Sequence, residues 1–487
     1  MMHFCKTLHA FLVYPIILVN LTILFGCSVD NSLEQETTTY FDISIKVEGQ
    51  GKVTPETGFY FKNSLILFEA TALSGYYFDR WIGFDEEIDI DQYSFLLTRN
   101  LTLTAVFLPI PDLTDEVLVF NPKEIDPNPV FMIENGGKSA YLTSKTGEKL
   151  KTWNFDSKLG NDIELMPDGG VIGIFKPESV SFSFGGYGGI LKRFDSDGSL
   201  LWQFEVNNDT ELMHHDFEIL PNGNILILIW EKFTSDEALN MGFAGDGPIY
   251  LEKLVEFIPE TKDIVWEWSS ADHLIQDYES SAENFGVVAK HPERINLNYS
   301  NQDNGDLMHA NGLTYDPKRD VVFLSVNFYS EVWVIPHQFD TQESKTELGN
   351  LIYRFGNPLA FNGEEERLFY NNHHPSLINL NASSLDNFLI YMNGSMSHQS
   401  KVFEFILPAV FDSVPLNWLN PQINWTFTDP DLFSAKISGA YRLPNGNTLI
   451  CEGDFGYWEV NSSGSIVWKF DGDTTYWRGY VYPEFTQ

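Results

Sequence analysis

The 487-residue sequence has few cysteines and few basic residues, and each shortage argues against a class of protein. It holds three cysteines, without a CxxC pair or zinc-finger spacing, so neither a disulfide scaffold nor a cysteine-ligated zinc site is expected. Lys and Arg number 30 against 68 Asp and Glu, giving a formal net charge of −38. Because phosphate binding needs basic surface, this balance argues against nucleic acid as a partner. A small anionic substrate in a locally positive pocket stays possible.

Nucleotide-binding motifs are also missing. The sequence contains no P-loop and no other glycine-rich phosphate cradle. A nucleotide donor therefore has no support, and no cofactor is expected.

The first 26 residues are typical of a secretory signal. An apolar stretch over residues 10–26 is interrupted by proline and polar residues, whereas a membrane-spanning helix needs ~20 apolar residues. The stretch ends in Leu24-Phe-Gly-Cys27, which resembles the bacterial lipobox, whose cysteine becomes the lipidated first residue of the mature protein. We therefore expect a lipid on Cys27, a flexible tether over residues 27–39, and attachment to the bacterial cell envelope through the lipid alone, facing the periplasm or the cell surface. The alternative is an ordinary secretory signal with a chance cysteine.

Residues 40–108 predict a small all-β module. Short alternating strands such as "ISIKV" and "LTLTAVF" are separated by glycine and proline turns. The pattern "GQGKVTP", then "GYYFDRW", then "NLTLTAVF" resembles the internalin-type B repeat. That resemblance implies a surface spacer or adhesion module without chemistry. The following "LPIPDLTDE" (108–116) is expected to be a linker stiffened by its two prolines.

From about residue 117 the sequence is a repeat array. Strand–turn–strand units with P-x-G turns alternate with a strand that ends aromatic-x-aromatic, and this marker recurs at Trp153/Phe155, Trp202/Phe204, Trp266/Trp268, Tyr353/Phe355, Trp425/Phe427 and Trp468/Phe470. Such units without helical periodicity predict an all-β fold, a six-bladed β-propeller over residues 117–487. A long β-sandwich would not explain this constant register. Since too few residues follow the sixth marker for another blade, strands around 127–145 are expected to complete the last one.

Histidines gather at one level of this predicted propeller. The innermost strand of each blade should follow each aromatic marker and line the central channel. Five of the eleven histidines lie at the start of that strand in three successive blades, namely His214 and His215 in "MHHDFEIL", His309 in "MHANGLTYD", and His373 and His374 in "NNHHPSLI". Arg478 occupies the corresponding place in the last blade. The repetition favours a common site over separate structural histidines.

Two kinds of chemistry fit such a ring. Three imidazoles suit zinc or copper, but no H-E-x-x-H or other compact ligand pair occurs, so no metal is assigned. Alternatively, an imidazole can be a nucleophile while neighbouring donors, such as the amides of Asn311 and Asn372, stabilise negative charge on a group in transit. Sulfuryl transfer, like phosphoryl transfer, needs mainly such positioning and charge neutralisation.

The array resembles the bacterial arylsulfotransferase family. The segments that carry the resemblance are "DLMHANGLTYD", "HHDFEILPNGNIL", "NLIYRFGNPLAFNG…LFYNNHHPSLI…FLIYMNG" and "ISGAYRLPNGNTLICEGDFGYWEVNSSGSIVWKF". The resemblance implies that an aryl sulfate gives its sulfuryl group to His373, and that a phenol then takes it from the sulfohistidine. His309, Asn311 and one of His214 and His215 would hold the sulfate oxygens or move protons. His374 would support the nucleophile.

The sequence departs from the family pattern at two places. Asn327, in "FLSVNFYSEVWVI", stands where the family has an arginine, and Asn372 stands where it has a glutamine. Asn327 and Asn372 are the expected substrate-binding amides. Arg354 and Arg478 are candidates for the missing charge, although Arg354 is expected to face solvent or a neighbouring blade. The competing interpretation is a non-catalytic envelope propeller that binds a small ligand or glycan.

Overall fold

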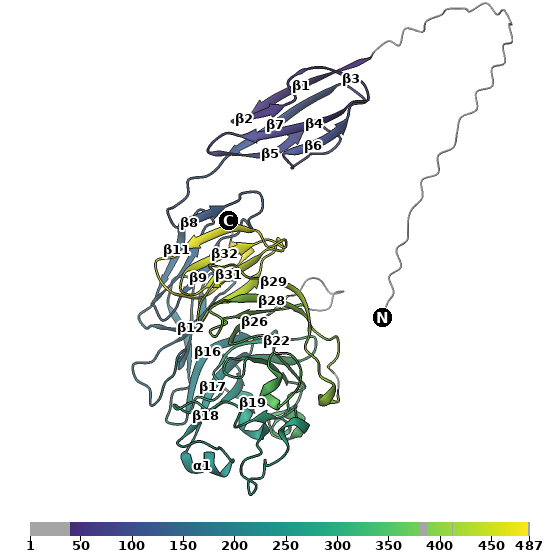
Figure 1. Ribbon diagram of the computed structural model, residues 1–487. Helices are drawn as coiled ribbons and strands as arrows, with labels where there is room; N and C mark the ends of the chain where they lie inside the picture. The colour runs from purple at the N-terminus through teal and green to yellow at the C-terminus, as the bar shows by residue number, and fades with distance from the viewer. Residues whose placement is uncertain (1–38, 379–386, 412, 486–487) are drawn as a thin grey trace, which may run out of the picture. The chain divides into compact units, whose positions relative to one another are not determined.

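The computed structural model describes residues 39–378, 387–411 and 413–485, which belong to two compact units (Figure 1). The first unit ends at Pro109 and the second begins at Ile110. The predicted signal peptide and Cys27 lie outside the described residues. Within the described ranges, no helix has the length and apolar character needed to cross a membrane.

The described part of the first unit contains seven strands in two sheets, of order β3-β1-β7-β5 and β2-β4-β6. A core around the fully buried Trp81 and Phe68 joins them. Gly49 lies against the backbone of the closing strand, where a Cβ would stand 1.9 Å from the Phe107 carbonyl oxygen, so the first glycine of "GQGKVTP" is a packing requirement. The strands are β1 (Tyr40–Glu48), β2 (Gly51–Thr54), β3 (Gly58–Phe61), β4 (Leu65–Ala72), β5 (Tyr76–Ile82), β6 (Gln92–Leu96) and β7 (Leu101–Pro109).

The described part of the second unit contains six sheets of four or five strands, so the prediction of an all-β chain is confirmed. Neighbouring strands within each of these sheets are antiparallel, and the aromatic markers lie on β11, β15, β19, β25, β29 and β33. The sheets are β12 (Leu159–Leu165), β13 (Val171–Phe175), β14 (Ile190–Phe194), β15 (Leu200–Glu205); β16 (Glu211–Ile219), β17 (Ile225–Phe233), β18 (Ile249–Phe257), β19 (Ile264–Ser269); β22 (Ala310–Asp316), β23 (Val321–Val326), β24 (Glu331–Pro336), β25 (Tyr353–Phe355); β26 (Asn372–Ile378), β27 (Asn387–Met392), β28 (Lys401–Ile406), β29 (Gln422–Phe427); β30 (Gly439–Arg442), β31 (Thr448–Glu452), β32 (Gly456–Val460), β33 (Ile466–Asp471), β8 (Val117–Phe120); and β34 (Tyr476–Val481), β9 (Val130–Glu134), β10 (Ser139–Thr143), β11 (Lys149–Asn154).

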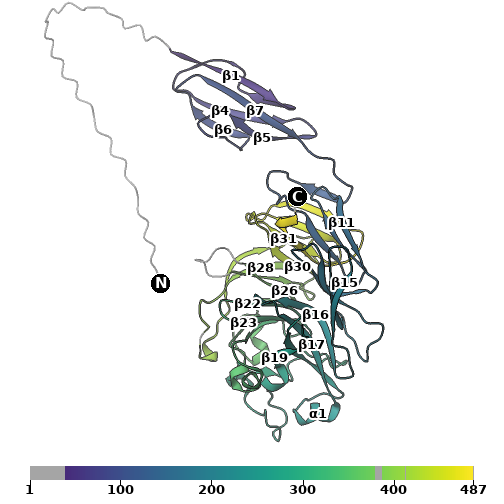
Figure 2. The same cartoon turned by 180° about the vertical axis from the view of Figure 1, so that it is seen from behind.

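The last of these sheets joins the two ends of the unit. Strand β34 pairs with β9, with Gly479 opposite Met132, which confirms that strands near 127–145 complete the last sheet. Strand β8 adds to β33 in the preceding sheet. In Figures 1 and 2 the early blue strands accordingly lie beside the late yellow ones.

Neighbouring sheets contact one another through their first strands and through shared cores. Strand β12 lies beside β16, β16 beside β22, β22 beside β26, β26 beside β30, β30 beside β34, and β34 beside β12. A hydrophobic core fills the space between each of these pairs of sheets; Ile174 and Leu191, for example, pack with Ile227 and Val255. The six first strands therefore carry the side chains that face one another.

Most of the first strands have a β-bulge near their beginning. The pairing register shifts between Met213 and Phe217 in β16 and between His373 and Ser376 in β26, and β12, β22 and β34 have similar shifts. The backbone has φ values of 54° at His215, 51° at His309 and 53° at His374, in the left-handed region. A bulge re-aims the side chains around it, so strict alternation does not apply where the histidines lie.

The remaining elements are short and lie in connections. The segment after β19 adds Leu274, Ile295 and Leu297 to a hydrophobic core and leads to Asp306, which pairs with His309. These elements are α1 (Ser235–Asn240), α2 (Thr341–Ser344), β20 (Leu274–Ile275), β21 (Ile295–Asn296) and the 3₁₀ turns Ser270–His273, Val288–Lys290, Glu347–Gly349, Pro358–Phe361, Pro415–Asn417 and Pro483–Phe485.

Candidate active site

Two cavities lie along the first strands of the sheets, and β12, β16, β26 and β34 give successive residues to both. The histidine cavity, of about 280 Å³, is lined by His215, His309, His373, Lys176, Lys436 and Trp477, among others. The acidic cavity, of about 300 Å³, is lined by Asp162, Glu164, Asp216, Glu218, His374 and Arg478, among others. Three of the five predicted histidines therefore meet in one place.

His373 enters the histidine cavity with a defined tautomer. Its Nδ1 lies 2.5 Å from Oδ1 of Asn393, and the Asn393 amide nitrogen donates to the carbonyls of Ser434 and Ile437 at 3.0 Å each. Because the amide hydrogens are used in this way, Oδ1 accepts the proton of His373 Nδ1, and Nε2 keeps its lone pair. Burial lowers the pKa of His373 to about 3, against the opposing effect of the Asn393 bond. The imidazole is thus neutral at physiological pH, as a nucleophile must be.

The pKa of His309 is shifted in the opposite direction from that of His373. The Nδ1 atom of His309 lies 2.5 Å from Oδ2 of Asp306, three residues earlier, and its ring stacks on Phe328 at 4.8 Å. Burial lowers the pKa of His309, but the Asp306 carboxylate more than offsets this, and the resulting pKa lies above the usual 6.5. The structure therefore places in the same cavity one imidazole whose pKa is lowered, His373, and one whose pKa is raised, His309.

His215, and not His214, faces this cavity. The His215 and His309 rings lie 4.9 Å apart. Gly186, in the loop over the cavity, leaves the space at His215 Nε2 open, because a Cβ there would stand 2.0 Å from this nitrogen. His214 is fully buried behind it, stacked on Trp230 at 3.8 Å.

Two lysines add positive charge to the histidine cavity. Lys176 is half-buried, with Nζ 4.2 Å from the centre of the Tyr187 ring, and burial lowers its pKa, with Lys158 contributing. Lys436 is exposed at the cavity rim. Of the described residues that line the cavity, none is Asp or Glu, although the chain has a net charge of −38. The cavity therefore suits an anion.

The predicted amides lie beneath the histidine cavity. Asn311 donates to the Asn372 carbonyl at 2.7 Å, and Asn372 donates to Ser325 Oγ and the Glu331 carbonyl. Both amides are fully buried and hold neighbouring first strands together. Asn327 also donates to the Asn372 carbonyl, and its amide nitrogen lies 3.5 Å from His373 Nδ1. In this arrangement all three amides position the strand of His373 and do not line the cavity.

Three other predicted residues lie elsewhere. Arg354 is fully buried and does not face solvent, because its guanidinium pairs with both oxygens of Glu331 and donates to two backbone carbonyls. Arg478 lines the acidic cavity, 3.0 Å from Asp216. His374 lines that cavity too, so the pair that begins β26 is divided between the two cavities. Neither arginine lines the histidine cavity, although the charge of Arg478 helps to lower the pKa of His373.

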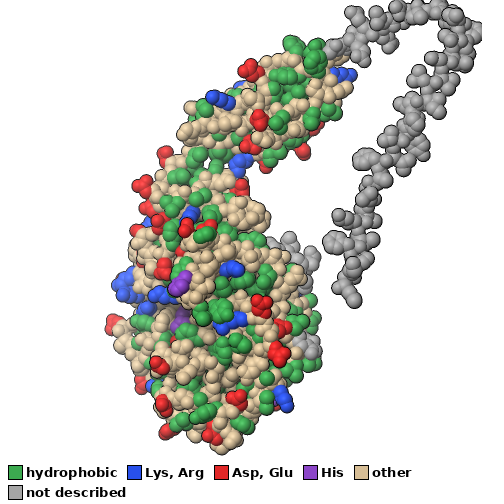
Figure 3. Space-filling view, viewed as in Figure 1, with side chains coloured by type: hydrophobic (Ala, Val, Ile, Leu, Met, Phe, Trp, Pro, Cys, Tyr) green, Lys and Arg blue, Asp and Glu red, His purple; other side chains and the backbone are tan. Residues whose placement is uncertain are grey.

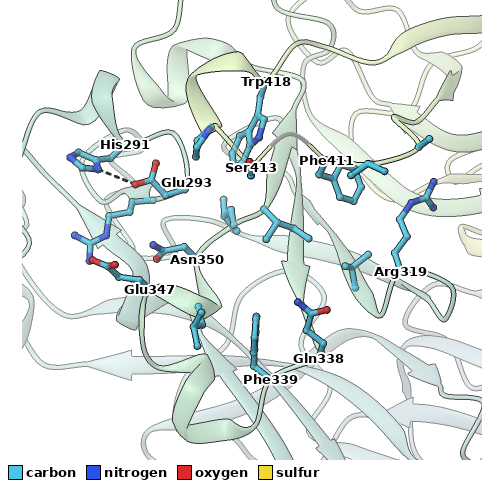
Figure 4. Close-up of a pocket in the computed structure, with 18 residues that line it drawn as sticks. His291, Glu293, Arg319, Gln338, Phe339, Glu347, Asn350, Phe411, Ser413 and Trp418 are labelled. Carbon is cyan, nitrogen blue, oxygen red and sulfur yellow. Dashed lines mark hydrogen bonds and ion pairs between the residues drawn. The ribbon is translucent and has the colours of Figure 1, made fainter.

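A larger cavity, of about 930 Å³, is not this site. It lies beside β25 and the segment after β28, among apolar side chains such as Leu351, Phe411 and Trp418 (Figure 4). Its one histidine, His291, pairs with Glu293 at 2.9 Å, and no buried histidine cluster faces it. We therefore place the chemistry in the smaller histidine cavity.

No metal cluster is found in the described part of the chain. No group of three or more His, Cys, Asp or Glu side chains there is arranged to hold a metal ion. On the face in Figure 3, acidic side chains are scattered, and Lys or Arg side chains lie beside the places where histidine reaches the surface.

Two models of known protein families match this chain. The model of the arylsulfotransferase (ASST) family matches residues 162–473, and that of the divergent InlB B-repeat domain matches residues 41–111. The chain belongs to the arylsulfotransferase family. The two predicted resemblances are thus confirmed at family level, and the family match covers most of the residues that line the two cavities. A comparison with curated proteins gives no match.

Solved structures give only distant likenesses. A protein described as a 6-phosphogluconolactonase from Bacteroides fragilis has 10% identity and a TM-score of 0.39, over 74% of this chain and 100% of that one. Another so described, from Bacteroides uniformis, has 12% identity and a TM-score of 0.36, over 83% and 100%. At these scores neither carries an argument about fold or function.

Several residues of the site were missed in the sequence. Asn393 stands in "YMNG", inside a segment that resembles the arylsulfotransferase family, so its place in that motif was a usable signal. Asp306 precedes His309 by three residues in "DLMH", and this short spacing was a second signal in the sequence. Lys176 and Lys436 lie in connections and carry no signal, because only the closed arrangement of strands brings them together.

Proposed function

We propose that the chain transfers a sulfuryl group from a phenolic sulfate ester to a phenol through a sulfohistidine at His373. The observation that carries this proposal is the neutral imidazole of His373, with Nε2 free, in a cavity that is lined by no carboxylate and by two lysines and His309, whose pKa is raised by Asp306. Family membership supports the same chemistry. A phenolic sulfate carries one negative charge, which this cavity can neutralise.

The proposed roles follow from position. His373 Nε2 attacks the sulfur, while Lys176, Lys436 and the protonated His309 face the sulfuryl oxygens. These cations supply charge that Asn327, in place of the family arginine, cannot. A weakly basic imidazole is also a good leaving group, so the same burial that keeps His373 neutral favours transfer from sulfohistidine to the phenol.

The fold proposed for this chemistry is a six-bladed β-propeller. Six sheets whose first strands contact one another in sequence, with a core between each neighbouring pair, support it. So does the pairing of β34 with β9, which joins the ends of the unit in one sheet.

Turnover of a chromogenic aryl sulfate tests the function. Purified protein with 4-nitrophenyl sulfate and a phenol acceptor is expected to release 4-nitrophenol and form the acceptor sulfate, and the His373→Ala variant should do neither. A well-folded protein that binds the ester without releasing phenol would instead favour the ligand-binding interpretation.

We also propose that a lipid on Cys27 tethers the protein to the cell envelope, on the strength of the lipobox-like sequence. Cys27→Ser should release the processed protein into the soluble fraction. Membrane association of a correctly processed Cys27→Ser protein would contradict the proposal.

A further inference from the structure

Behind His215, buried side chains form a continuous row from the histidine cavity into the protein. His215 Nδ1 lies 2.8 Å from His214 Nδ1, and His214 Nε2 lies 3.1 Å from Glu252 Oε2. His214 and Glu252 are both fully buried. Among the described residues no hydrogen-bond partner is found for His215 Nε2, which opens toward the cavity beside Gly186.

The fold holds each member of the row in place. The left-handed backbone at His215 turns its ring toward that of His214, which stacks on Trp230 with an interplanar angle of 4°. Glu252, in β18, accepts the Ala310 N–H at 2.7 Å through its other oxygen. The His214 Nε2–Glu252 Oε2 contact is 3.1 Å long but lacks the alignment of a hydrogen bond, and both atoms are without a hydrogen-bond partner in the described ranges, so a small rotation of either side chain is needed to pass a proton between them.

The two facing Nδ1 atoms restrict where protons can be. Only one of them carries a proton, because two N–H groups or two lone pairs cannot form this contact. If Glu252 is protonated, it donates to His214 Nε2, His214 Nδ1–H donates to His215, and His215 Nε2–H faces the cavity. If Glu252 is ionised, each bond reverses and His215 Nε2 presents a lone pair.

We propose that Glu252, His214 and His215 form a proton relay that gives a proton to the departing phenol and recovers it from the acceptor phenol. This inference rests on the proposed sulfuryl transfer. His215 is the group that touches substrate, whereas His214 and Glu252 act through it.

The proton balance closes over one cycle. In the first half-reaction the sulfur–aryl oxygen bond breaks as the bond from sulfur to His373 Nε2 forms. The aryl oxygen takes the proton from His215 Nε2, His214 Nδ1–H moves to His215, and the Glu252 proton moves to His214 Nε2. In the second half-reaction the acceptor hydroxyl returns a proton to His215 Nε2, and each step reverses while the acceptor oxygen takes the sulfuryl group.

The charges around the row favour storage of a proton on Glu252. Burial raises the pKa of Glu252, and the nearby Asp306 raises it further, against the opposing effects of the Ala310 N–H and His309. Burial lowers the pKa of both His214 and His215. Asp306, Asp216, His309, His373 and Arg478 are the other charged or titratable groups that act on the row.

Glu252→Gln tests the relay in the whole protein. The amide that this substitution introduces can donate to His214 Nε2 but cannot release a proton, so His215 stays a donor. Glu256→Gln is the matched control, because Glu256 lies in the same strand and pairs with His337 at 2.8 Å outside the cavity. We expect Glu252→Gln to slow transfer to a weakly acidic phenol such as 4-methylphenol by ~10²-fold. The burst of 4-nitrophenol, an acidic leaving group that needs no proton, should change less than about threefold. Equal slowing of both reactions, or of neither, would overturn the relay.

A second measurement needs neither a variant nor turnover. In ¹⁵N spectra of the wild-type protein, the His214 and His215 tautomers should switch together as Glu252 ionises. Rings that keep independent tautomers over the whole pH range would overturn the relay. Absence of sulfuryl transfer by a wild-type protein whose rings do switch together would instead contradict the proposed function alone.

Discussion

The histidine cavity and the acidic cavity are nearly equal in volume and share the first strands β12, β16, β26 and β34, but side chains of opposite charge line them. Successive residues are divided between them: Asn161 and Asp162, His215 and Asp216, His373 and His374, Trp477 and Arg478. Bulges near the beginning of most first strands mark the places where this division occurs. In a strongly acidic chain, one cavity can therefore stay free of carboxylates, because Asp162 and Asp216 directly follow the residues that line it and face the other cavity.

The two cavities also differ in how their charges are compensated. In the acidic cavity four carboxyl groups meet one guanidinium, and burial raises the pKa of Glu164 and Glu218 to about 8, with neighbouring carboxylates adding to the effect. In the histidine cavity the excess is cationic. The difference predicts that substitutions in one cavity affect chemistry and those in the other affect mainly stability.

The largest expected effect separates the two adjacent histidines. His373→Ala should abolish sulfuryl transfer, because it removes the proposed nucleophile, whereas His374→Ala should lower kcat by only a few-fold. Steady-state kinetics with a chromogenic aryl sulfate, with thermal melts to verify folding, measure both. Loss of turnover in His374→Ala alone would show that the nucleophile has been assigned to the wrong cavity.

Removal of the charge partner of His309 should give the next largest effect. Asp306→Asn leaves burial to lower the His309 pKa, so the cation is lost at pH 7 and kcat/KM should fall by ~10²-fold. The pKa of His309 in the folded wild-type protein is raised above 6.5. The stabilisation that the His309–Asp306 pair gives is therefore complete below pH 6.5 and is lost as the pH rises through the folded-state pKa, and activity should fall over the same range. The variant should regain activity toward acid. An unchanged pH–rate profile would show that the His309 charge has no role.

Loss of a lysine at the cavity should weaken donor binding. Lys176→Ala and Lys436→Ala should each raise KM for the anionic donor by about tenfold, which corresponds to ~1.4 kcal/mol. The exposed Lys290 lies outside the cavity, so Lys290→Ala is the matched control and should leave KM unchanged. Equal effects of all three substitutions on KM would show that the donor responds to the net charge of the protein and not to lysines at the cavity.

The acidic cavity should give the smallest effect, on stability. Since the folded-state pKa of Glu164 is raised, the folded protein loses stability as pH rises from about 4.5 to about 8. Glu164→Gln should therefore raise Tm at pH 8 by ~2–4 °C and leave kcat unchanged. The exposed Glu260→Gln should change neither quantity. A fall in kcat with Glu164→Gln would mean that the two cavities are coupled.

Much of the architecture could be predicted because hairpins and aromatic markers repeat. The first strands at "MHHDFEIL", "MHANGLTYD" and "NNHHPSLI" were placed correctly, and so was the completion of the last sheet by N-terminal strands. The grouping of His215, His309 and His373 followed from that register.

The predictions that were wrong or missing concern the direction of side chains and the paths of the connections between strands. Arg354 looked exposed from its own strand, but Glu331 on the neighbouring strand β24 holds it in a buried ion pair. Bulges decide whether His214 or His215 faces the cavity, and a bulge depends on pairing between strands, which one segment does not encode. Lys176 and Lys436 reach the site through connections whose paths only the folded chain defines.

Mass spectrometry of the sulfated intermediate tests the central claim most directly. The protein is incubated with 4-nitrophenyl sulfate without acceptor and is then digested under alkaline conditions that preserve the nitrogen–sulfur bond. It should carry one sulfuryl group, on His373. A phenol acceptor added before digestion should remove it, and His373→Ala should never acquire it. Release of 4-nitrophenol with His373 unmodified, or with the group on His215 or His309, would contradict the account.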